Sequence, residues 1–149
     1  MLRRVRAGGG SVYTLTELGA SVRPTLEQLA YWGARVGRVA PPEHRRSIRA
    51  EAMALQAILV HGGRVDPDRP CVVEVALGDE RITFELGERP TAEARPAVDA
   101  DARLRGRRWL FTDYLDGARL RGDDLALVAG SSDAHRLLVR ALRGSPPSD

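Results

Sequence analysis

Three histidines and one cysteine are the side chains that first suggest catalysis or metal binding. His44, His61 and His135 lie far apart in the sequence and lack the His-Glu-x-x-His spacing by which a helix presents two histidines to zinc. His135 falls near the start of a predicted helix, where we interpret it as a surface residue. Cys71 is the only cysteine, which excludes an internal disulfide and a cysteine-rich metal site. We expect no metal and no cofactor.

Two pairs of neighbouring carboxylates do not change that expectation. Asp99 and Asp101 are placed to share one face of a strand, and Asp123 with Asp124 has the composition of a turn. Paired carboxylates alone do not make acid–base machinery. The glycines at 8–10 lack the lysine and the strand–loop–helix context of a phosphate-binding loop. We therefore expect that the chain is not an enzyme.

Length and composition place the chain among ordinary globular proteins. It has 149 residues, 43% hydrophobic and 29% charged, with a formal net charge of +3, so it forms one domain or two small ones. No apolar run reaches the roughly 20 residues of a membrane span, and no apolar segment follows the basic N-terminus as in a signal peptide. The expected location is cytoplasmic, with no membrane partner.

The first part of the chain predicts a hairpin followed by a long helix. Residues 2–6 and 11–15 are β-prone and are separated by three glycines. Thr16 is a good N-cap for a helix over about residues 17–36, in which Pro24 should bend the axis or weaken one turn. Apolar residues at steps of three and four form one face of this helix.

The rest of the chain predicts an α+β domain, an antiparallel sheet covered on one face by helices. A helix is expected over 43–61, and strands over 71–77 and 80–86 form a hairpin. Weaker strands are expected at 91–95 and 98–104, a short helix at 106–116 and a strand at 125–129. Ser131 or Ser132 should cap a final helix, and the tail at 144–149 should be disordered.

The segment YTLTELGASVRPTLEQLAYWG resembles the end of the winged helix-turn-helix domain in HxlR-type bacterial transcription regulators. The matching residues are Tyr13, Leu15, Thr16, Gly19, Pro24, Leu26, Trp32 and Gly33. The resemblance implies that residues 1–40 hold the second wing strand and the helix that forms the family's homodimer interface. Residues 43–143 are similar, in the order of their elements, to the sterol-carrier-like domain that follows this helix in some of those proteins.

The resemblance stops where the DNA-reading part should be. Only residues 1–10 precede the wing strand, which leaves no room for a recognition helix. The resemblance thus implies a truncated, dimeric HxlR-like regulator whose second domain senses a small apolar ligand. The alternatives are a small-molecule or lipid-binding module without a DNA role, and a dominant-negative dimerisation partner of full-length regulators.

These interpretations predict three sets of residues. A weak DNA contact to phosphates is expected from Arg3, Arg4, Arg6 and Ser11. The resemblance implies a dimer interface of Leu18, Val22, Leu26, Leu29, Trp32 and Val36. A ligand cavity would be lined by Val73, Val75, Ile82, Phe84, Trp109, Phe111, Tyr114 and Leu115, although residues of this pattern usually just fill a core.

Overall fold

The computed structural model describes residues 2–7, 10–22, 24–26, 28–29 and 47–143, with only the backbone for residues 2–15. The predicted hairpin is present in the first part of the chain. Strand β1 (Leu2–Ala7) pairs antiparallel with β2 (Gly10–Leu15). Helix α1 (Glu17–Ser21) follows, and the Thr16 hydroxyl caps it by accepting a hydrogen bond from the Gly19 amide at 3.1 Å.

The long helix predicted over residues 17–36 is interrupted. Helix α1 ends at Ser21, and within the described residues helical backbone is next found at 24–26 and 28–29. Pro24 lacks the amide hydrogen that would continue the ladder, and its ring crowds the preceding turn. The Leu26 amide then donates to the Val22 carbonyl at 3.1 Å. The predicted residues Trp32 and Val36 lie outside the described part of the chain.

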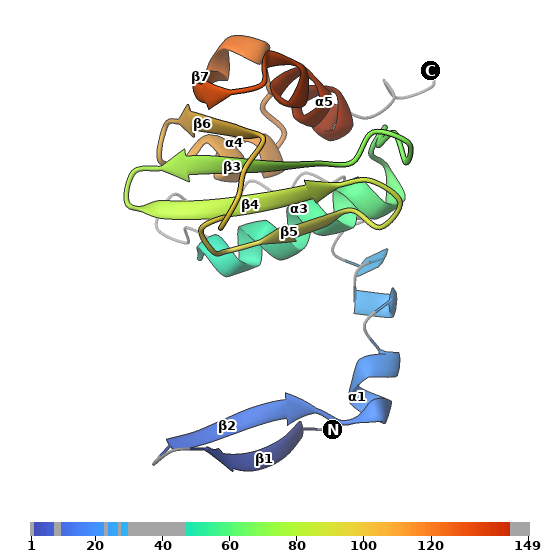
Figure 1. Cartoon of the computed structure of the whole chain (residues 1–149). Helices are drawn as coiled ribbons and strands as arrows, with labels where there is room; N and C mark the ends of the chain where they lie inside the picture. The colour runs from blue at the N-terminus through green and yellow to red at the C-terminus, as the bar shows by residue number, and fades with distance from the viewer. Residues whose placement is uncertain (1, 8–9, 23, 27, 30–46, 144–149) are drawn as a thin grey trace.

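A five-stranded sheet in the order β5-β4-β3-β6-β7 forms the second part of the chain (Figure 1). Its strands are β3 (Cys71–Leu77), β4 (Glu80–Leu86), β5 (Thr91–Glu93), β6 (Ala102–Gly106) and β7 (Leu125–Gly130). The prediction of an antiparallel sheet is wrong for one pair of strands, because β3 and β6 run parallel. The sheet is therefore mixed.

The parallel pair follows from the path between β5 and β6. Residues 94–101 cross the sheet in front of β4 and β3 before they enter β6 (Figure 1). Hydrogen bonds attach this segment to β4 and β3. The Thr83 hydroxyl donates to the Arg95 carbonyl at 2.7 Å, and the Ala97 amide donates to the Glu74 carboxylate at 2.9 Å. The Asp101 amide donates to the Val72 carbonyl at 2.8 Å. Thr83 lies beneath the segment and is 1% exposed.

Helices pack on the other face of the sheet. They are α3 (Ile48–His61), α4 (Leu110–Leu115) and α5 (Ser132–Arg143), with the short 3-10 turn η1 (Gly122–Asp124) before β7. The predicted start of α3 at residue 43 is outside the described residues; Ser47 caps the helix through the Ala50 amide. None of the described helices is long and apolar enough to cross a membrane.

One charged residue is buried between the helices. Glu51 in the first turn of α3 is 2% exposed and accepts a hydrogen bond from the Thr112 hydroxyl of α4. A buried carboxyl group is tolerated only when polar partners replace its water. This contact therefore fixes the position of α4 against α3.

Candidate functional site

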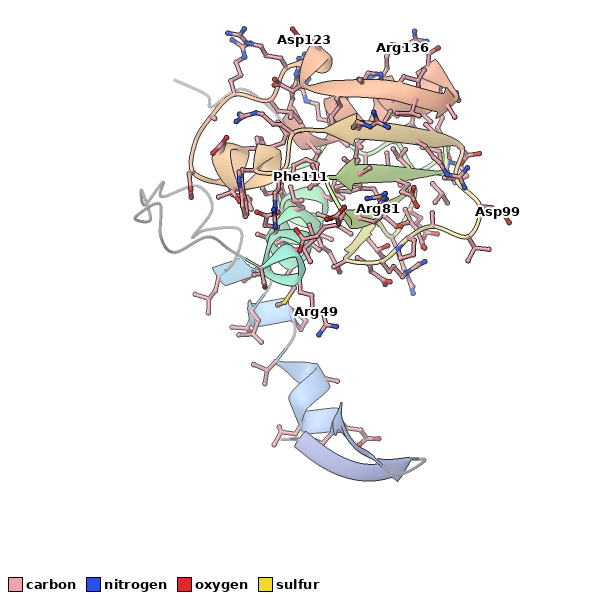
Figure 2. All side chains as sticks on the ribbon, turned by 90° about the vertical axis from the view of Figure 1, so that its left-hand side faces the viewer. Arg49, Arg81, Asp99, Phe111, Asp123 and Arg136 are labelled. Carbon is pink, nitrogen blue, oxygen red and sulfur yellow. The ribbon has the colours of Figure 1, made fainter. Side chains whose placement is uncertain are left out.

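The residues predicted to line a ligand cavity come together, but as packed core. Val73, Val75, Ile82, Phe84 and Phe111 are fully buried. The rings of Phe84 and Phe111 meet edge-to-face with centroids 5.7 Å apart. Figure 2 shows Phe111 in the interior between the sheet and the helices. Leu115 is buried in the same cluster. Neither of the two pockets described below is lined by any of these residues.

The two polar aromatic residues of that set lie at the rim of the core. Trp109 precedes α4, and the Arg108 guanidinium lies 5.0 Å from its ring centroid. The Tyr114 hydroxyl donates a hydrogen bond to the Leu142 carbonyl, which ties α4 to the end of α5. The polar tip of Tyr114 thus serves packing between helices. A ligand at these eight positions stays a prediction.

A pocket of about 400 Å³ lies instead along the outer side of α5, and we call it the arginine pocket. Its lining residues come from the loop after α3, from η1 and from one face of α5: Arg64, Gly122, His135, Arg136, Val139, Arg140 and Arg143. Four of these seven are arginines, and none is acidic. The pocket is therefore surrounded by positive charge.

Neighbouring groups hold two of these arginines in place. The Nε of Arg143 donates to the Leu120 carbonyl at 3.1 Å, which fixes the direction of its guanidinium. Arg136 donates to the Asp133 carboxylate at 2.8 Å. We call residues 47–143, which form the five-stranded sheet and its helices, the sheet-and-helix unit. Figure 2 shows Arg136 at the outside of this unit.

Asp133 also bonds Arg69, so one carboxylate joins two arginines. The hydrogen bond from Arg136, with the positive charge of Arg69, lowers the pKa of Asp133 although burial opposes the shift. Asp133 stays ionised at neutral pH, and the stability that these pairs add is lost only as pH falls through this lowered pKa. The contribution is small because the groups are exposed.

A second, smaller cleft of about 270 Å³ lies at the start of β3 and α5, and we call it the Cys71 cleft. Its lining residues are Arg69, Pro70, Cys71, Asp101, Ser131, Asp133, Ala134 and Leu137. Asp101 accepts a hydrogen bond from the Val72 amide at 2.7 Å, and Ser131 caps α5 through the Asp133 and Ala134 amides. These polar groups thus serve the local backbone.

The thiol in this cleft is poorly suited to nucleophilic chemistry. Burial, followed by the negative charge of Asp101, raises the pKa of Cys71. Because the thiolate is the reactive form, a raised pKa keeps the thiol protonated and slow to react at neutral pH. The cleft therefore offers no activated nucleophile.

We predict that iodoacetamide alkylates Cys71 in the folded chain more slowly than it alkylates free cysteine at pH 8. The fraction of alkylated chain should be followed over time by mass spectrometry, with the chain unfolded in urea as the reference. Asp101→Asn, which keeps an oxygen acceptor for the Val72 amide, should speed the reaction. A folded chain that reacts as fast as free cysteine would contradict the shift.

The predicted DNA and dimer residues belong to the first part of the chain. The hairpin register sets Arg6 opposite Ser11, Arg4 opposite Tyr13 and Arg3 opposite Thr14. Leu18, Leu26 and Leu29 are 63%, 52% and 57% exposed, so these leucines are uncovered in the single chain. Val22 is half-buried at the end of α1. DNA binding and dimerisation stay predictions.

The sequence pattern did not predict the arginine pocket. His135, interpreted as a surface residue, is partly buried, and its Nε2 is enclosed with no hydrogen-bond partner among the described residues. Arg136, Arg140 and Arg143 at steps of four and three do predict one basic helix face. Within the described residues, no cluster of three metal-ligating side chains is present.

Comparison with known proteins gives little further information. No protein-family model matches the chain, and no curated protein matches it. A solved structure described as "UbiJ-SCP2 Ubiquinone synthesis protein" aligns with 86% of this chain and 93% of its own length, at 16% identity and a TM-score of 0.38. A TM-score this low does not establish a common fold, so no ligand or role is transferred from that protein. The chain is an α+β protein with a mixed five-stranded sheet.

Proposed function

We propose that the chain is a non-catalytic module that binds a small molecule carrying a negatively charged group, and that the arginine pocket holds that group. The observation that carries the proposal is a space of about 400 Å³ whose lining includes four arginines and no acidic residue. Among the lining arginines, Arg140 forms no hydrogen bond or ion pair within the described residues, so its positive charge has no counter-charge there. An anionic ligand supplies that charge.

The size and the remaining lining support a ligand larger than a simple ion. Pockets of about 300–1,000 Å³ are typical of small-molecule sites. Val139 contributes an apolar side chain, and the methylene stems of the arginines add further apolar surface. The proposal therefore keeps the small-molecule alternative expected from the sequence, but gives the ligand a charged end.

We predict that benzoate binds the full chain and that benzamide, its uncharged analogue of the same shape, does not bind measurably under the same conditions. Thermal unfolding at low ionic strength should show a rise in Tm with benzoate concentration, because a ligand that binds only the folded state stabilises it. The rise should shrink as salt is added. Equal effects of the two compounds would contradict a charged site.

Arg140→Ala gives the matched test of location. Arg140 lines the pocket and forms no hydrogen bond or ion pair within the part of the chain that is described. Its removal should lower benzoate affinity about tenfold, the low end for a hydrogen bond to a charged group. Arg89→Ala removes the same charge from an exposed residue outside the pocket and should leave affinity unchanged. If both variants lose affinity equally, net charge rather than the pocket attracts the anion.

The transcription-regulator interpretation is a separate proposal that rests on the resemblance of residues 13–33. It adds DNA contacts at Arg3, Arg4 and Arg6, for which the structure describes no side chains. Its dimer helix keeps Leu18, Leu26 and Leu29 available for a partner. The anion-binding proposal does not depend on it.

A further inference from the structure

We infer that the outer edge of β7 binds a short, extended, acidic segment of a partner protein as an added strand. The inference goes beyond the proposed small-molecule function and does not depend on it. It follows from the open backbone edge of β7, from the side chains at that edge and from the charge of this half of the sheet.

Strand β7 forms one end of the sheet (Figure 1). Within the described residues β7 pairs only with β6, so the backbone groups on its other side have no strand partner there. Edge strands are commonly protected from pairing with other chains by a charged side chain, a proline or a bulge. The residues of β7, Leu125–Gly130, include neither a charged residue nor a proline. The edge is therefore suited to β-augmentation, in which main-chain hydrogen bonds hold an extended peptide.

A bulge limits the length of the added strand. The register between β6 and β7 passes from Leu127 to Ala129 and gives Val128 no partner on β6. Regular strand geometry before the bulge covers Leu125–Leu127. Because a bulge discourages open-ended growth of a sheet, we expect this edge to accept a short segment.

The largest side chains at this edge are apolar and exposed. Leu127 is 40% exposed and Val128 is 56% exposed. Leu127 pairs with the buried Leu104, so it lies on the face of the sheet that the helices cover. A strand added at the edge brings one of its own side chains beside Leu127 on that face. An apolar residue at this position covers surface that the single chain exposes to water.

The half of the sheet that carries β7 is basic, which favours an acidic partner. Residues 102–143, which form β6, α4, β7 and α5, contain nine arginines and five aspartates. Residues 47–101, which form α3 and the other three strands, contain eleven acidic residues and six arginines. A second copy paired through β7 would bring two basic halves together, whereas an acidic segment meets the opposite charge.

Arg105 on β6 is suited to contact such a segment. It is exposed, whereas its neighbour Leu104 is buried, so it lies on the sheet face away from the helices. Its guanidinium forms no hydrogen bond or ion pair within the part of the chain that is described. Its partner on β7 is Ala126, whose short side chain covers little of that face. An added strand lies about 10 Å from β6, within the combined reach of an arginine and a glutamate side chain. The segment that fits therefore alternates acidic and apolar residues.

The test is fluorescence polarisation of labelled peptides of about nine residues with the full chain at low ionic strength. The first peptide alternates valine and glutamate, the second has lysine in place of each glutamate, and the third is the first with its central valine replaced by proline. The glutamate peptide should bind, and the lysine peptide should not bind measurably. The proline peptide keeps the charge but interrupts the hydrogen-bond ladder, so it should bind at least about tenfold more weakly.

Arg105→Glu tests the location of the peptide. It should weaken binding of the glutamate peptide at least about tenfold and raise the affinity for the lysine peptide, because it reverses the charge beside the added strand. Arg89→Glu makes the same change at an exposed residue between β4 and β5 and should leave both affinities unchanged. Circular dichroism checks that both variants fold.

Four outcomes overturn the inference. The first is that the glutamate peptide does not bind. The second is equal binding of the glutamate and proline peptides, which shows attraction by charge without strand pairing. The third is an equal loss in Arg105→Glu and Arg89→Glu, which places the peptide elsewhere. The fourth is a dimer in light scattering that Val128→Asp converts to a monomer and Val98→Asp, a matched change at an exposed residue outside β7, does not; a second copy then occupies the edge.

Discussion

Replacing Gly130 by alanine should destabilise the sheet-and-helix unit by about 3 kcal/mol or more. Gly130 ends β7 with a φ of +89°, a conformation that L side chains rarely adopt. An added Cβ would also lie 2.1 Å from the Asp101 carbonyl oxygen and 2.9 Å from the Ala102 Cα. These are backbone atoms, so no side chain can move aside to relieve the clash.

The expected damage extends to α5 and the arginine pocket. The Ser131 amide donates to the same Asp101 carbonyl at 2.7 Å, and Ser131 caps α5. Pushing β7 away from β6 breaks this hydrogen bond and shifts the helix start. Urea denaturation followed by circular dichroism measures the change in the free energy of unfolding, and a chain that does not fold is the extreme of the same result.

Gly117→Ala is the matched control. Gly117 has a φ of +103°, but an added Cβ there meets nothing within 4 Å. This variant should therefore be destabilised only by conformational strain, by about 1–2 kcal/mol. If Gly130→Ala costs no more than Gly117→Ala, the close approach of β7 to β6 is not the dominant constraint.

Strands β3 and β4 could be predicted from the sequence because each is defined by local alternation, whereas the weaker strand expected at 98–104 lies at Ala102–Gly106. Val73, Val75 and Leu77 alternate with less buried residues along β3, and the burial follows that pattern. The parallel pairing of β3 with β6 could not be predicted in this way. It depends on residues 94–101 crossing the sheet, which hydrogen bonds between Thr83, Glu74 and distant backbone atoms specify. Such tertiary contacts leave no local pattern.

The first helix shows how apolar periodicity can outweigh a local rule. The steps of three and four predicted one helix over residues 17–36, with Pro24 expected only to bend it or weaken one turn. The structure instead ends α1 at Ser21. In the arginine pocket the limit was distance along the chain. Three arginines of α5 are visible as one helix face, but Arg64 and Gly122 join them only through the fold.

Phe84→Ala should cost about 3–5 kcal/mol, the range for removing a fully buried aromatic side chain. Phe84 is 0% exposed at the centre of β4, opposite Val73 on β3 and Ala92 on β5. Its ring also meets Phe111 of α4 edge-to-face, a contact that adds about 0.5–1.5 kcal/mol to simple burial. Chemical denaturation gives the cost, with Phe84→Leu as a control that keeps most of the volume and should cost clearly less.

The size of this destabilisation distinguishes a closely packed core around Phe84 from a preformed ligand cavity. If Val73, Val75, Ile82 and Phe111 pack closely against the ring, its removal leaves a cavity whose lining loses contacts, and the full cost appears. If they instead surround a preformed ligand space, removal enlarges an existing void and costs only about 1.5 kcal/mol. Benzene separates the two cases independently, since an apolar cavity stays dry and accepts such a molecule. In the packed case benzene should raise the Tm of Phe84→Ala but not of the wild-type chain. A rise in both would support the ligand cavity predicted among these core residues.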